Sequence, residues 1–368
     1  MKKLCVILNL APHYRKAIFQ AIDNEFNCDW YVGDRVEDIK TMSPDDLKRC
    51  KIIKNKAVYK HNYIQKGMLR LLLSRQYSRF LVTGDIRNIS LWLFLLLSKL
   101  LPNKKVYTWT HGSNGKGGRL SNIFKKVFAS LSDGIFLYGN YARDYMISQG
   151  SNPKKLYVIH NSLDHSSQLT FRKQLSNTDV YKKHFKNDYL NLIFIGRLTA
   201  VKRLDLLVTA VSLLAAKGCD YNIIFVGDGQ ERENLEKLVE SYGLSDRVWF
   251  YGACYDELKN AELIYNADLC VSPGNVGLTA IHSLMYGTPV ATNNNFLLQM
   301  PEFEAVIEGK TGTYFDYDNA QSIAEAIDKW FGKFGNKRYL IRENCMNEID
   351  SNWTPQYQIN ILKTYLSL

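Results

Sequence analysis

The sequence lacks the cysteine patterns that would indicate a zinc site, a redox pair or a disulfide framework. Its seven cysteines are odd in number and never form a C-x-x-C pair, which disfavours metal and dithiol motifs. Several lie in apolar runs such as Leu4-Cys5-Val6-Ile7, as reduced core thiols of a cytosolic protein do. With 8 prolines and 23 glycines in 368 residues, the chain is not of the collagen or low-complexity type either.

No apolar run is long enough to cross a bilayer. The most apolar window, Ile89 to Leu101, is interrupted by two serines and a lysine, and it falls short of the about 20 residues that a membrane-spanning helix needs. The first residues lead directly into a strand-like segment, without the apolar region and cleavage site of a signal peptide. We therefore expect a buried helix in this window and a protein that does not span a membrane.

Acidic residues are scarce in the first half of the chain. Residues 1–165 contain 27 Lys and Arg against 12 Asp and Glu, whereas residues 166–368 contain 20 against 24, so the net charge of +11 arises entirely in the first half. The stretch from Leu47 to Gly84 has ten basic residues and no acidic one. Such an excess suggests nucleic acid, an anionic membrane or a phosphorylated substrate as partner, and the alternative is a solvated face without a ligand.

Short apolar runs alternate with segments of helical periodicity. In the first half they predict strands at Leu4–Leu10, Cys28–Val32, Phe80–Thr83, Val106–Thr110, Gly134–Leu137 and Leu156–Ile159. In the second half the predicted order is strand Leu190–Ile195, helix Arg203–Ala216, strand Tyr221–Val226, helix Glu231–Tyr242, strand Val248–Tyr251, helix Asp256–Tyr265, strand Leu269–Ser272, helix Leu278–Tyr286 and strand Pro289–Ala291. Alternation of this kind is typical of parallel α/β sheets with right-handed crossovers.

The length of 368 residues fits two domains of this type. A polar segment from Asp164 to Asp188 has no sustained pattern and separates the two series, so we interpret it as a connector. We expect Rossmann-like domains at residues 1–165 and 166–350, and a C-terminal helix at residues 351–368 that packs back toward the first domain. In such domains ligands bind beyond the carboxyl ends of the strands.

The loop after the first strand of the second domain combines a glycine with two separated cations. It reads Gly196-Arg197-Leu198-Thr199-Ala200-Val201-Lys202-Arg203, and Arg197 and Lys202 bracket the start of a helix, where anions are favoured. Arginine can hold two phosphate oxygens, and lysine supplies a mobile point charge. The loop therefore suits a diphosphate; the alternative is a basic turn that caps the helix.

Two further loops follow buried strands of the same domain. Gly227-Asp228-Gly229 needs a tight turn whatever its function. The segment Ser272-Pro273-Gly274-Asn275-Val276-Gly277-Leu278-Thr279 joins a strand to a helix, and its small residues would let a ligand approach the backbone N–H groups at the helix start. His282 falls in the first two turns of that helix.

The order of these motifs resembles family-4 glycosyltransferases of the GT-B fold, which are retaining enzymes that use nucleotide sugars. Between residues 190 and 315 the resemblance rests on G-R-x(4)-K, V-G-D-G, Y-G, A-D, G-L, Y-G-T-P-V, P-E and E-G-K-T-G. In the first half it rests on Pro12-His13-Tyr14-Arg15, Trp109-Thr110-His111-Gly112 and the segment from Val158 to Asp164. It implies two Rossmann-like domains that face each other across a central cleft.

The resemblance also implies roles for individual residues. Arg197 and Lys202 match the pair that binds the donor diphosphate, where they would stabilise charge on the leaving nucleotide. His111 matches a histidine that faces the donor sugar, and the alternative for it is a core or capping histidine. The implied donor-binding residues are Pro12, Arg15, Gly196, Gly227, Gly252, Asn275, Gly277, Leu278, Thr279, His282 and Glu302.

One departure from the family pattern concerns two glutamates with seven residues between them. This sequence has Gly274 and His282 at those places. The second glutamate of the family bonds the nucleotide ribose, and a neutral histidine can also accept such a bond. For the first glutamate, Glu302 or Glu304 would have to supply the carboxylate. The departure bears on donor identity more than on activity, because catalysis in this family depends on the donor phosphate and on positioning.

A metal requirement is not expected. Asp316-Tyr317-Asp318 has the D-x-D form of a manganese motif, but it stands just before a predicted helix, where turn and capping roles are common for aspartate. Arg197 and Lys202 already provide the positive charge that a metal would bring. We therefore predict no metal and no cofactor besides the nucleotide sugar as co-substrate.

The acid-free stretch contains a candidate amphipathic helix from Lys66 to Phe80. At the helical period, Leu69, Leu72, Leu73 and Phe80 would share one face. The basic residues Lys66, Arg70, Arg75 and Arg79 would border that face, as on a helix that lies on an anionic bilayer. We assign these four, together with Lys116 from the glycine-rich loop after His111, to the acceptor or membrane side. The alternative is a core helix.

The sequence as a whole predicts a metal-independent glycosyltransferase that acts on a saccharide, or on a lipid-linked saccharide, in surface polysaccharide or glycolipid assembly. We expect it in the cytoplasm, peripheral at the inner face of the cell membrane. A catalytically degenerate partner that only binds sugar nucleotides is the main alternative. A nucleic-acid-binding protein is another, although the basic stretch has no helix-turn-helix, RNA-recognition or zinc-finger signature.

Overall fold

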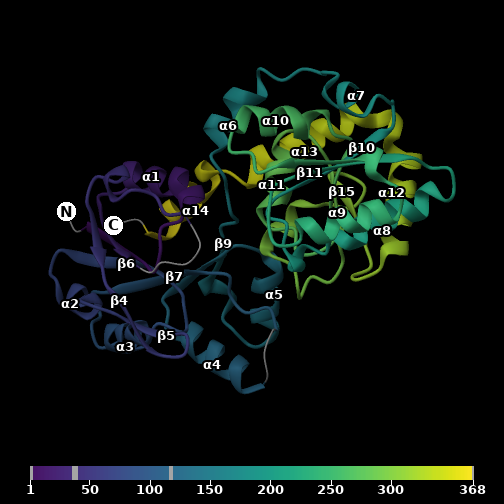
Figure 1. The fold of residues 1–368 in the computed structure, drawn as a ribbon. Helices are drawn as coiled ribbons and strands as arrows, with labels where there is room; N and C mark the ends of the chain where they lie inside the picture. The colour runs from purple at the N-terminus through teal and green to yellow at the C-terminus, as the bar shows by residue number, and fades with distance from the viewer. Residues whose placement is uncertain (1–2, 35–39, 116–118, 367–368) are drawn as a thin grey trace. The chain divides into compact units, whose positions relative to one another are not determined.

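The computed structural model describes residues 3–34, 40–115 and 119–366, and it divides into two compact units (Figure 1). Unit 1 consists of Met1–Asp164 and Thr354–Leu368, and unit 2 of His165–Trp353. Each unit has its own parallel sheet with helices on both faces. The prediction of two Rossmann-like α/β domains is therefore confirmed.

The sheet of unit 1 has seven parallel strands in the order β3-β2-β1-β6-β7-β8-β9. Their bounds are β1 Lys3–Leu8, β2 Cys28–Gly33, β3 Cys50–Ile53, β6 Tyr77–Thr83, β7 Lys105–Thr110, β8 Gly134–Leu137 and β9 Leu156–Val158. The strand order reverses between β1 and β6, which makes the ends of these strands the expected ligand side. A separate antiparallel hairpin, β4 Asn55–Tyr59 with β5 Asn62–Gln65, is inserted before β6.

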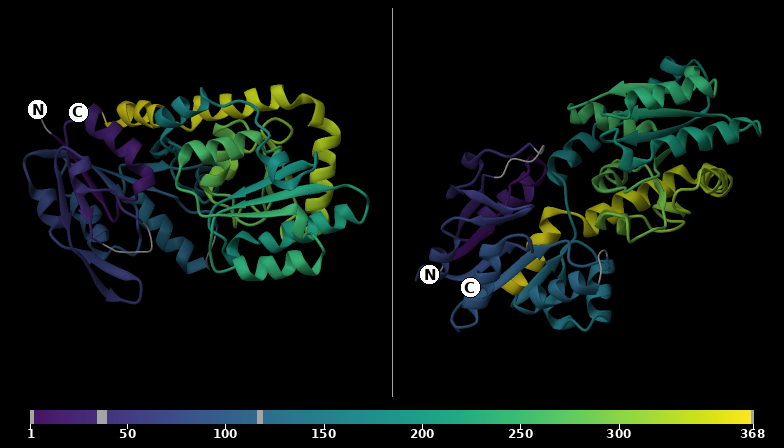
Figure 2. Two further views of the ribbon diagram at one scale, coloured as in Figure 1. Left: turned by 45° about the horizontal axis from the view of Figure 1, so that its top comes forward. Right: turned by 60° about the horizontal axis from the view of Figure 1, so that its bottom comes forward.

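Helices cover both faces of this sheet (Figure 1). They are α1 Lys16–Glu25, α2 Met68–Leu73, α3 Ile89–Ser98, α4 Arg119–Ser130, α5 Asn140–Ser148 and α14 Pro355–Leu366. Because neighbouring residues of a strand point to opposite faces, Leu4 and Val6 of β1 pack in one core with α1 and α14, and Cys5 and Ile7 pack in another with α2 and α3. Helix α14, near the C-terminal end of the chain, thus returns to unit 1 and lies beside α1 (Figures 1 and 2).

The sheet of unit 2 has six parallel strands in the order β12-β11-β10-β13-β14-β15. Their bounds are β10 Leu190–Ile195, β11 Tyr221–Val226, β12 Val248–Gly252, β13 Leu269–Ser272, β14 Val290–Asn293 and β15 Gly312–Phe315. The reversal falls between β10 and β13, so the loops after these two strands lie at the point where Rossmann-type sheets bind ligands.

The helices of unit 2 form two groups. Their bounds are α6 His165–Arg172, α7 Val180–Phe185, α8 Leu204–Ala215, α9 Arg232–Ser241, α10 Glu257–Asn266, α11 Leu278–Met285, α12 Ala320–Phe334 and α13 Arg338–Asn352. Helix α8 contacts α9 and α12, whereas α10 contacts α6 and α7, and α11 contacts α13. Figure 1 shows the first group on one face of the sheet and α10, α11 and α13 on the other.

Three regions differ from the sequence prediction. The segment from Lys66 to Phe80 is not one helix: α2 ends at Leu73, Arg75 lies in a turn, and Arg79 and Phe80 belong to the central strand β6. The interpreted connector carries α6 and α7, whose Tyr181 and Phe185 are buried against Trp249. The short strands β3, β4, β5 and β15 were not predicted, because strands of only four or five residues leave little periodicity to read.

Candidate functional site

The loops after β10, β11 and β13 pack against one another at the carboxyl end of the unit 2 sheet. Gly274 lies so close to the preceding loop that an added Cβ would come within 2.7 Å of the Cα of Lys202, and the Gly274 N–H donates to the Lys202 carbonyl at 2.9 Å. An added Cβ at Gly227 would likewise come within 2.9 Å of the Gly196 carbonyl carbon. Glycine is therefore required here by backbone packing.

Three of the predicted donor-binding glycines take part in the same junction. Gly196 donates its N–H to Val226 at 2.9 Å, and Gly227 donates its N–H to the carbonyl of Gly252 at 2.8 Å. The structure thus brings Gly196, Gly227 and Gly252 together, and the contacts it shows for them are contacts between loops. Their packing fixes the position of the cationic segment that starts at Arg197.

Lys202 is held at the centre of these loops. Its Nζ donates to the backbone carbonyl of Asn275 at 2.6 Å and to Asn275 Oδ1 at 2.8 Å. Burial lowers the pKa of Lys202 to about 8, although the nearby carboxylate of Glu302 acts in the opposite direction. Glu302 is itself 2% exposed, in a short helical turn Pro301–Ala305. The structure therefore joins three predicted residues into one polar cluster, in which Glu302 is buried and Lys202 and Asn275 are half-buried.

Two residues that the sequence analysis did not find hold the loop after β13. Asn293 Nδ2 donates to the carbonyls of Pro273 at 2.9 Å and Gly274 at 2.7 Å. Gln299 Oε1 accepts from the N–H of Val276 at 2.8 Å, and its Nε2 donates to the Asn293 carbonyl at 3.1 Å. Both side chains are at most 4% exposed, so their bonds are strong constraints on the loop.

Arg197 is exposed at the end of β10, and its guanidinium has no ion pair or hydrogen bond within the described residues. The neighbouring cation is used differently, because Arg203 forms ion pairs with Asp205, at 3.0 Å, and with Asp318. Of the three cations in this loop, Arg197 is the one left available to an anion, and Lys202 is the one held half-buried against Asn275.

Helix α11 begins directly after this loop. Gly277 has a positive φ of 54°, Leu278 is the first helical residue, and Thr279 follows. The Thr279 hydroxyl donates to the carbonyl of Ile195 at 2.9 Å, which ties the helix start to the end of β10. The positive end of the α11 backbone dipole therefore lies at the same loops as Lys202.

His282, one turn further along α11, is bonded to a residue that the sequence analysis did not find. Its Nε2 lies 3.0 Å from Glu257 Oε1, which also accepts from the Tyr286 hydroxyl at 2.7 Å and from Gln168 Nε2 at 3.0 Å. Burial disfavours a charged Glu257, but these hydrogen bonds outweigh it and lower the pKa of Glu257 to about 2. Because a carboxylate only accepts, Nε2 of His282 carries a proton.

In unit 1, the structure brings Arg15 and His111 together at the carboxyl ends of β1 and β7. The Arg15 guanidinium lies 4.0 Å from the centre of the Trp109 ring and 5.4 Å from that of Tyr138, and its buried Nε and Nη2 have no hydrogen-bond partner within the described residues. The His111 ring lies 4.7 Å from that of Tyr138 and keeps an exposed face. Burial on the other side and the charge of Arg15 lower the pKa of His111, so its ring is neutral at pH 7.

The remaining predicted residues of unit 1 do not form one face. Pro12 precedes the helical turn of Arg15 and forms a bridge with Thr41. Lys66, Arg70 and Arg75 are exposed on different elements, Arg79 is half-buried in β6, and Phe80 is part of the core. The predicted amphipathic membrane helix is therefore wrong, since its last residues form the central strand of the sheet. Lys116 lies outside the described residues.

The two aspartates of the D-x-D segment bond other side chains of unit 2. Asp316 Oδ1 accepts from Asn294 Nδ2 at 2.8 Å, Asp318 has a positive φ of 58° and pairs with Arg203, and Asn319 caps helix α12. Within residues 3–34, 40–115 and 119–366, no group of three or more His, Cys, Asp or Glu side chains is arranged to hold a metal ion. In the same ranges, no helix combines the length and apolar character that a membrane span requires.

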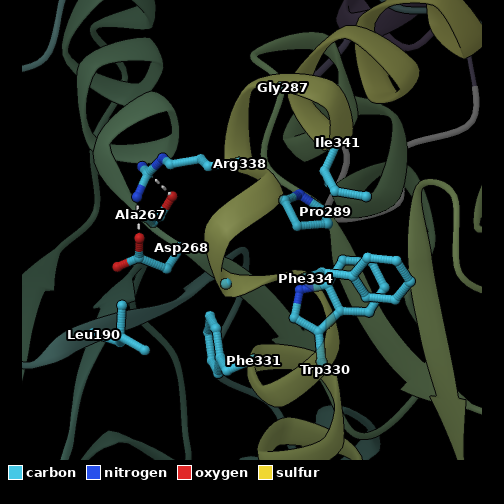
Figure 3. A pocket seen from close by; sticks show the side chains of 11 residues that line it. Leu190, Ala267, Asp268, Gly287, Pro289, Trp330, Phe331, Phe334, Arg338 and Ile341 are labelled. Carbon is cyan, nitrogen blue, oxygen red and sulfur yellow. Dashed lines mark hydrogen bonds and ion pairs between the residues drawn. The ribbon is translucent and has the colours of Figure 1, made fainter.

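A pocket at the opposite, amino end of the unit 2 strands contains none of the predicted residues (Figure 3). Trp330, Phe331 and Phe334 of α12 form its apolar wall, and Asp268 and Arg338 face each other as an ion pair. Because Asp268 and Arg338 bond each other, their charged groups are not free to bind a ligand. The remaining lining is mainly apolar, so the pocket offers a ligand few polar contacts.

The chain is similar to known proteins in two respects, its fold and the sequence of its second unit. The likeness to solved structures is one of fold: the Anabaena protein HepE in complex with UDP has a TM-score of 0.73 and 16% identity over 100% of both chains, and it was also solved with UDP-glucose. The chain has the GT-B fold, as the resemblance implied. Residues 176–344, a little under half of the chain, match the model of the family glycosyl transferases group 1.

The curated relatives match only part of this chain and part of their own length. A 41.2 kDa uncharacterized protein in the cps region of Klebsiella pneumoniae is 25% identical over 247 residues, which are 66% of this chain and 64% of that protein. A human relative, one of the subunits of phosphatidylinositol N-acetylglucosaminyltransferase, is 26% identical over 200 residues, which are 49% of this chain and 39% of the human protein. The alignments thus span less than two thirds of these relatives.

Proposed function

We propose that the chain is a retaining glycosyltransferase whose unit 2 binds the diphosphate of a nucleotide-sugar donor. The observation that carries this proposal is the setting of Lys202, which is held half-buried beside Asn275 and Glu302 in the loop after β10. The free guanidinium of Arg197 stands five residues earlier on the same loop. The bound UDP and UDP-glucose in the HepE structures support a nucleotide sugar as donor.

The chemistry follows from charge. When the glycosidic bond of the donor breaks, negative charge grows on the nucleotide diphosphate, and cations fixed beforehand at that place stabilise the transition state. Lys202 is fixed by its two bonds to Asn275, and Arg197 can grip phosphate oxygens in a fork. Two cations and the helix start at Gly277 supply the charge that a metal would bring, so we propose a metal-independent reaction.

Ring nitrogens of two histidines would position the donor. In this proposal Nδ1 of His282 bonds a ribose hydroxyl while Glu257 holds the other ring nitrogen. His111, neutral at pH 7, can bond a sugar hydroxyl without adding charge. The carboxylate that replaces the missing first glutamate of the family pattern is, in this proposal, Glu302, because it lies beside Lys202.

The proposed acceptor is a saccharide, or a lipid-linked saccharide, in surface polysaccharide or glycolipid assembly. The phosphatidylinositol in the name of the human relative supports a lipid acceptor, and the basic first half of the chain supports an anionic membrane as partner. We propose that the enzyme works in the cytoplasm, peripheral at the inner face of the cell membrane.

The test is binding followed by turnover. Thermal shifts with UDP-, GDP-, ADP- and CMP-sugars identify the donor, and hydrolysis or transfer of that donor is then measured for Arg197→Ala and Lys202→Ala. Lys217→Ala, at an exposed lysine of the same unit, is the matched control. Undiminished turnover in both site variants would overturn the assignment. Binding of a nucleotide sugar without hydrolysis or transfer would instead favour a degenerate sugar-nucleotide-binding partner.

A further inference from the structure

The outer face of helix α3 is apolar. Ile89, Leu93, Leu96 and Leu97, together with Leu100 just beyond the helix, are between 36% and 76% exposed. They recur at the helical period, opposite the buried Leu91, Phe94 and Leu95. A surface helix ordinarily has charged residues on its outer face, so this stripe calls for a partner that covers apolar side chains.

The neighbouring helix α4 extends the apolar surface. Its Ile123, Phe124 and Val127 are between 47% and 63% exposed. The two helices are in contact, because the Trp92 ring of α3 lies 5.0 Å from the Phe128 ring of α4, and Figure 1 shows them on the same side of the unit 1 sheet. We call the eight exposed side chains the α3–α4 face: Ile89, Leu93, Leu96, Leu97, Leu100, Ile123, Phe124 and Val127.

The charge around this face has one sign. Residues 47–132 contain 18 Lys and Arg but a single acidic residue, Asp85, and that residue pairs with Arg87 at 3.0 Å. Lys99 and Lys105 follow the α3 stripe and Lys126 lies within α4, all three exposed. The next acidic residue, Asp133, lies within 3.8 Å of both Lys99 and Lys105. The partner that fits is therefore both apolar and anionic.

We propose that the α3–α4 face binds the surface of an anionic lipid bilayer. Exposed leucines and phenylalanine would enter the boundary between headgroups and acyl chains, while the lysines around them contact lipid phosphates. A second copy of the chain fits poorly, because it would oppose the same positive charge, and a nucleic acid would leave the leucines uncovered. This proposal rests on the proposed function, because a lipid-linked acceptor would bring the enzyme to a membrane.

The experiment compares the full-length wild type with a triple variant, Leu93→Ser/Leu96→Ser/Leu100→Ser, by flotation with phosphatidylglycerol-containing vesicles and with phosphatidylcholine vesicles. We expect the wild type to float with the anionic vesicles and the triple variant to lose about tenfold or more of this binding. Tyr339→Ser/Leu340→Ser removes two exposed apolar residues of unit 2 and is the matched control, expected to bind like the wild type. Lys126→Glu should lose several-fold, and less so at high salt.

Three results would overturn the proposal. These are equal binding of the wild type to both kinds of vesicle, undiminished binding of the triple variant, and a wild-type dimer that the triple variant converts to a monomer in light scattering. Thermal shifts with the donor nucleotide sugar separate this inference from the proposed function. A triple variant that keeps the donor shift but loses the vesicles supports the α3–α4 face, whereas a wild type without any donor shift counts against the function only.

Discussion

The two units share a topology but use it differently. In both, the strand order reverses after the first three strands, so equivalent loops lie at the carboxyl ends of the central strands. In unit 2 these loops are packed backbone to backbone and bonded through buried Asn293 and Gln299. In unit 1 the corresponding end holds Arg15 over an aromatic ring, and the surface of the helices is apolar and basic.

Under the two proposals, this difference corresponds to two kinds of recognition. A small anionic ligand needs hydrogen-bond donors and cations at fixed positions. The packed loops around Lys202 hold such groups in place, and this packing requires glycine at positions such as 227 and 274. A bilayer needs area and charge but no exact geometry, and the α3–α4 face provides these without ordered loops. Each unit can be disturbed separately, which makes the comparison open to experiment.

The largest effect is expected at Lys202. Replacing it with alanine removes the half-buried cation, and we expect turnover to fall by about 10²–10³-fold, as for loss of a preorganised electrostatic group. Steady-state hydrolysis or transfer of the donor measures the loss. Vesicle binding through unit 1 should be unchanged; a parallel loss of vesicle binding would break the separation of the two units.

The second prediction concerns loop packing. Gly274→Ala places a methyl group against the backbone of Val201 and Lys202, and we expect it to lower the free energy of unfolding by about 1–3 kcal/mol, as overpacking does. Gly332→Ala, in helix α12 with open space around it, is the control and should be neutral or slightly stabilising. Urea denaturation compares the two; equal stability would mean that the packed loops of unit 2 are not constrained.

The third prediction uses pH. With a pKa of about 8, Lys202 is charged below that pH and loses its proton above it. A bound diphosphate favours the charged form, so donor affinity should be constant below pH 8 and weaken by up to about tenfold per unit above it. Isothermal titration of the donor nucleotide at several pH values measures the slope. Lys202→Arg keeps its charge and should flatten it; an equally steep slope in that variant would assign the titration elsewhere.

The smallest effect is expected at Glu257. Glu257→Gln replaces a charged acceptor of His282, Tyr286 and Gln168 with a neutral one, and we expect a loss of about 1 kcal/mol of stability at pH 7. Because the pKa of this carboxyl is lowered from 4.5 to about 2, its stabilising contribution is present above pH 4.5 and is lost toward pH 2. Denaturation curves of the wild type and the variant should therefore converge as the pH falls through this window. A constant difference would mean that charge is not what Glu257 contributes.

The sequence predicted the unit 2 core closely. The strands β10, β11 and β13 have the predicted bounds, because buried parallel strands are mostly apolar runs between polar loops. It also placed Arg197 and Lys202 at the end of β10. The region from Lys66 to Phe80 was misread, because a short helix followed directly by a strand mimics one amphipathic period when both bury leucine and phenylalanine on the same side.

Other parts of the site had no local signal. Glu257 lies 25 residues from His282, and Gln299 lies 23 residues from Val276. The polar run Asn293-Asn294-Asn295 after a buried strand was the one hint of the network that supports the loop. The apolar window at residues 89–101 was expected to be buried, and half of that helix is instead exposed, because a helix that is apolar all round does not reveal which side the sheet covers.

The sequence by itself determined the alternation of strands and helices, the two Rossmann-like units and the cations that end β10, because burial periodicity and loop chemistry are local properties. The tertiary structure alone decided which cation is half-buried, which carboxylate holds His282 and which side of α3 meets solvent. These depend on segments distant in the chain, and their contacts form only when the sheet brings the strand ends together. The basic excess of the first half was visible in the sequence, but the apolar face at which it gathers was not.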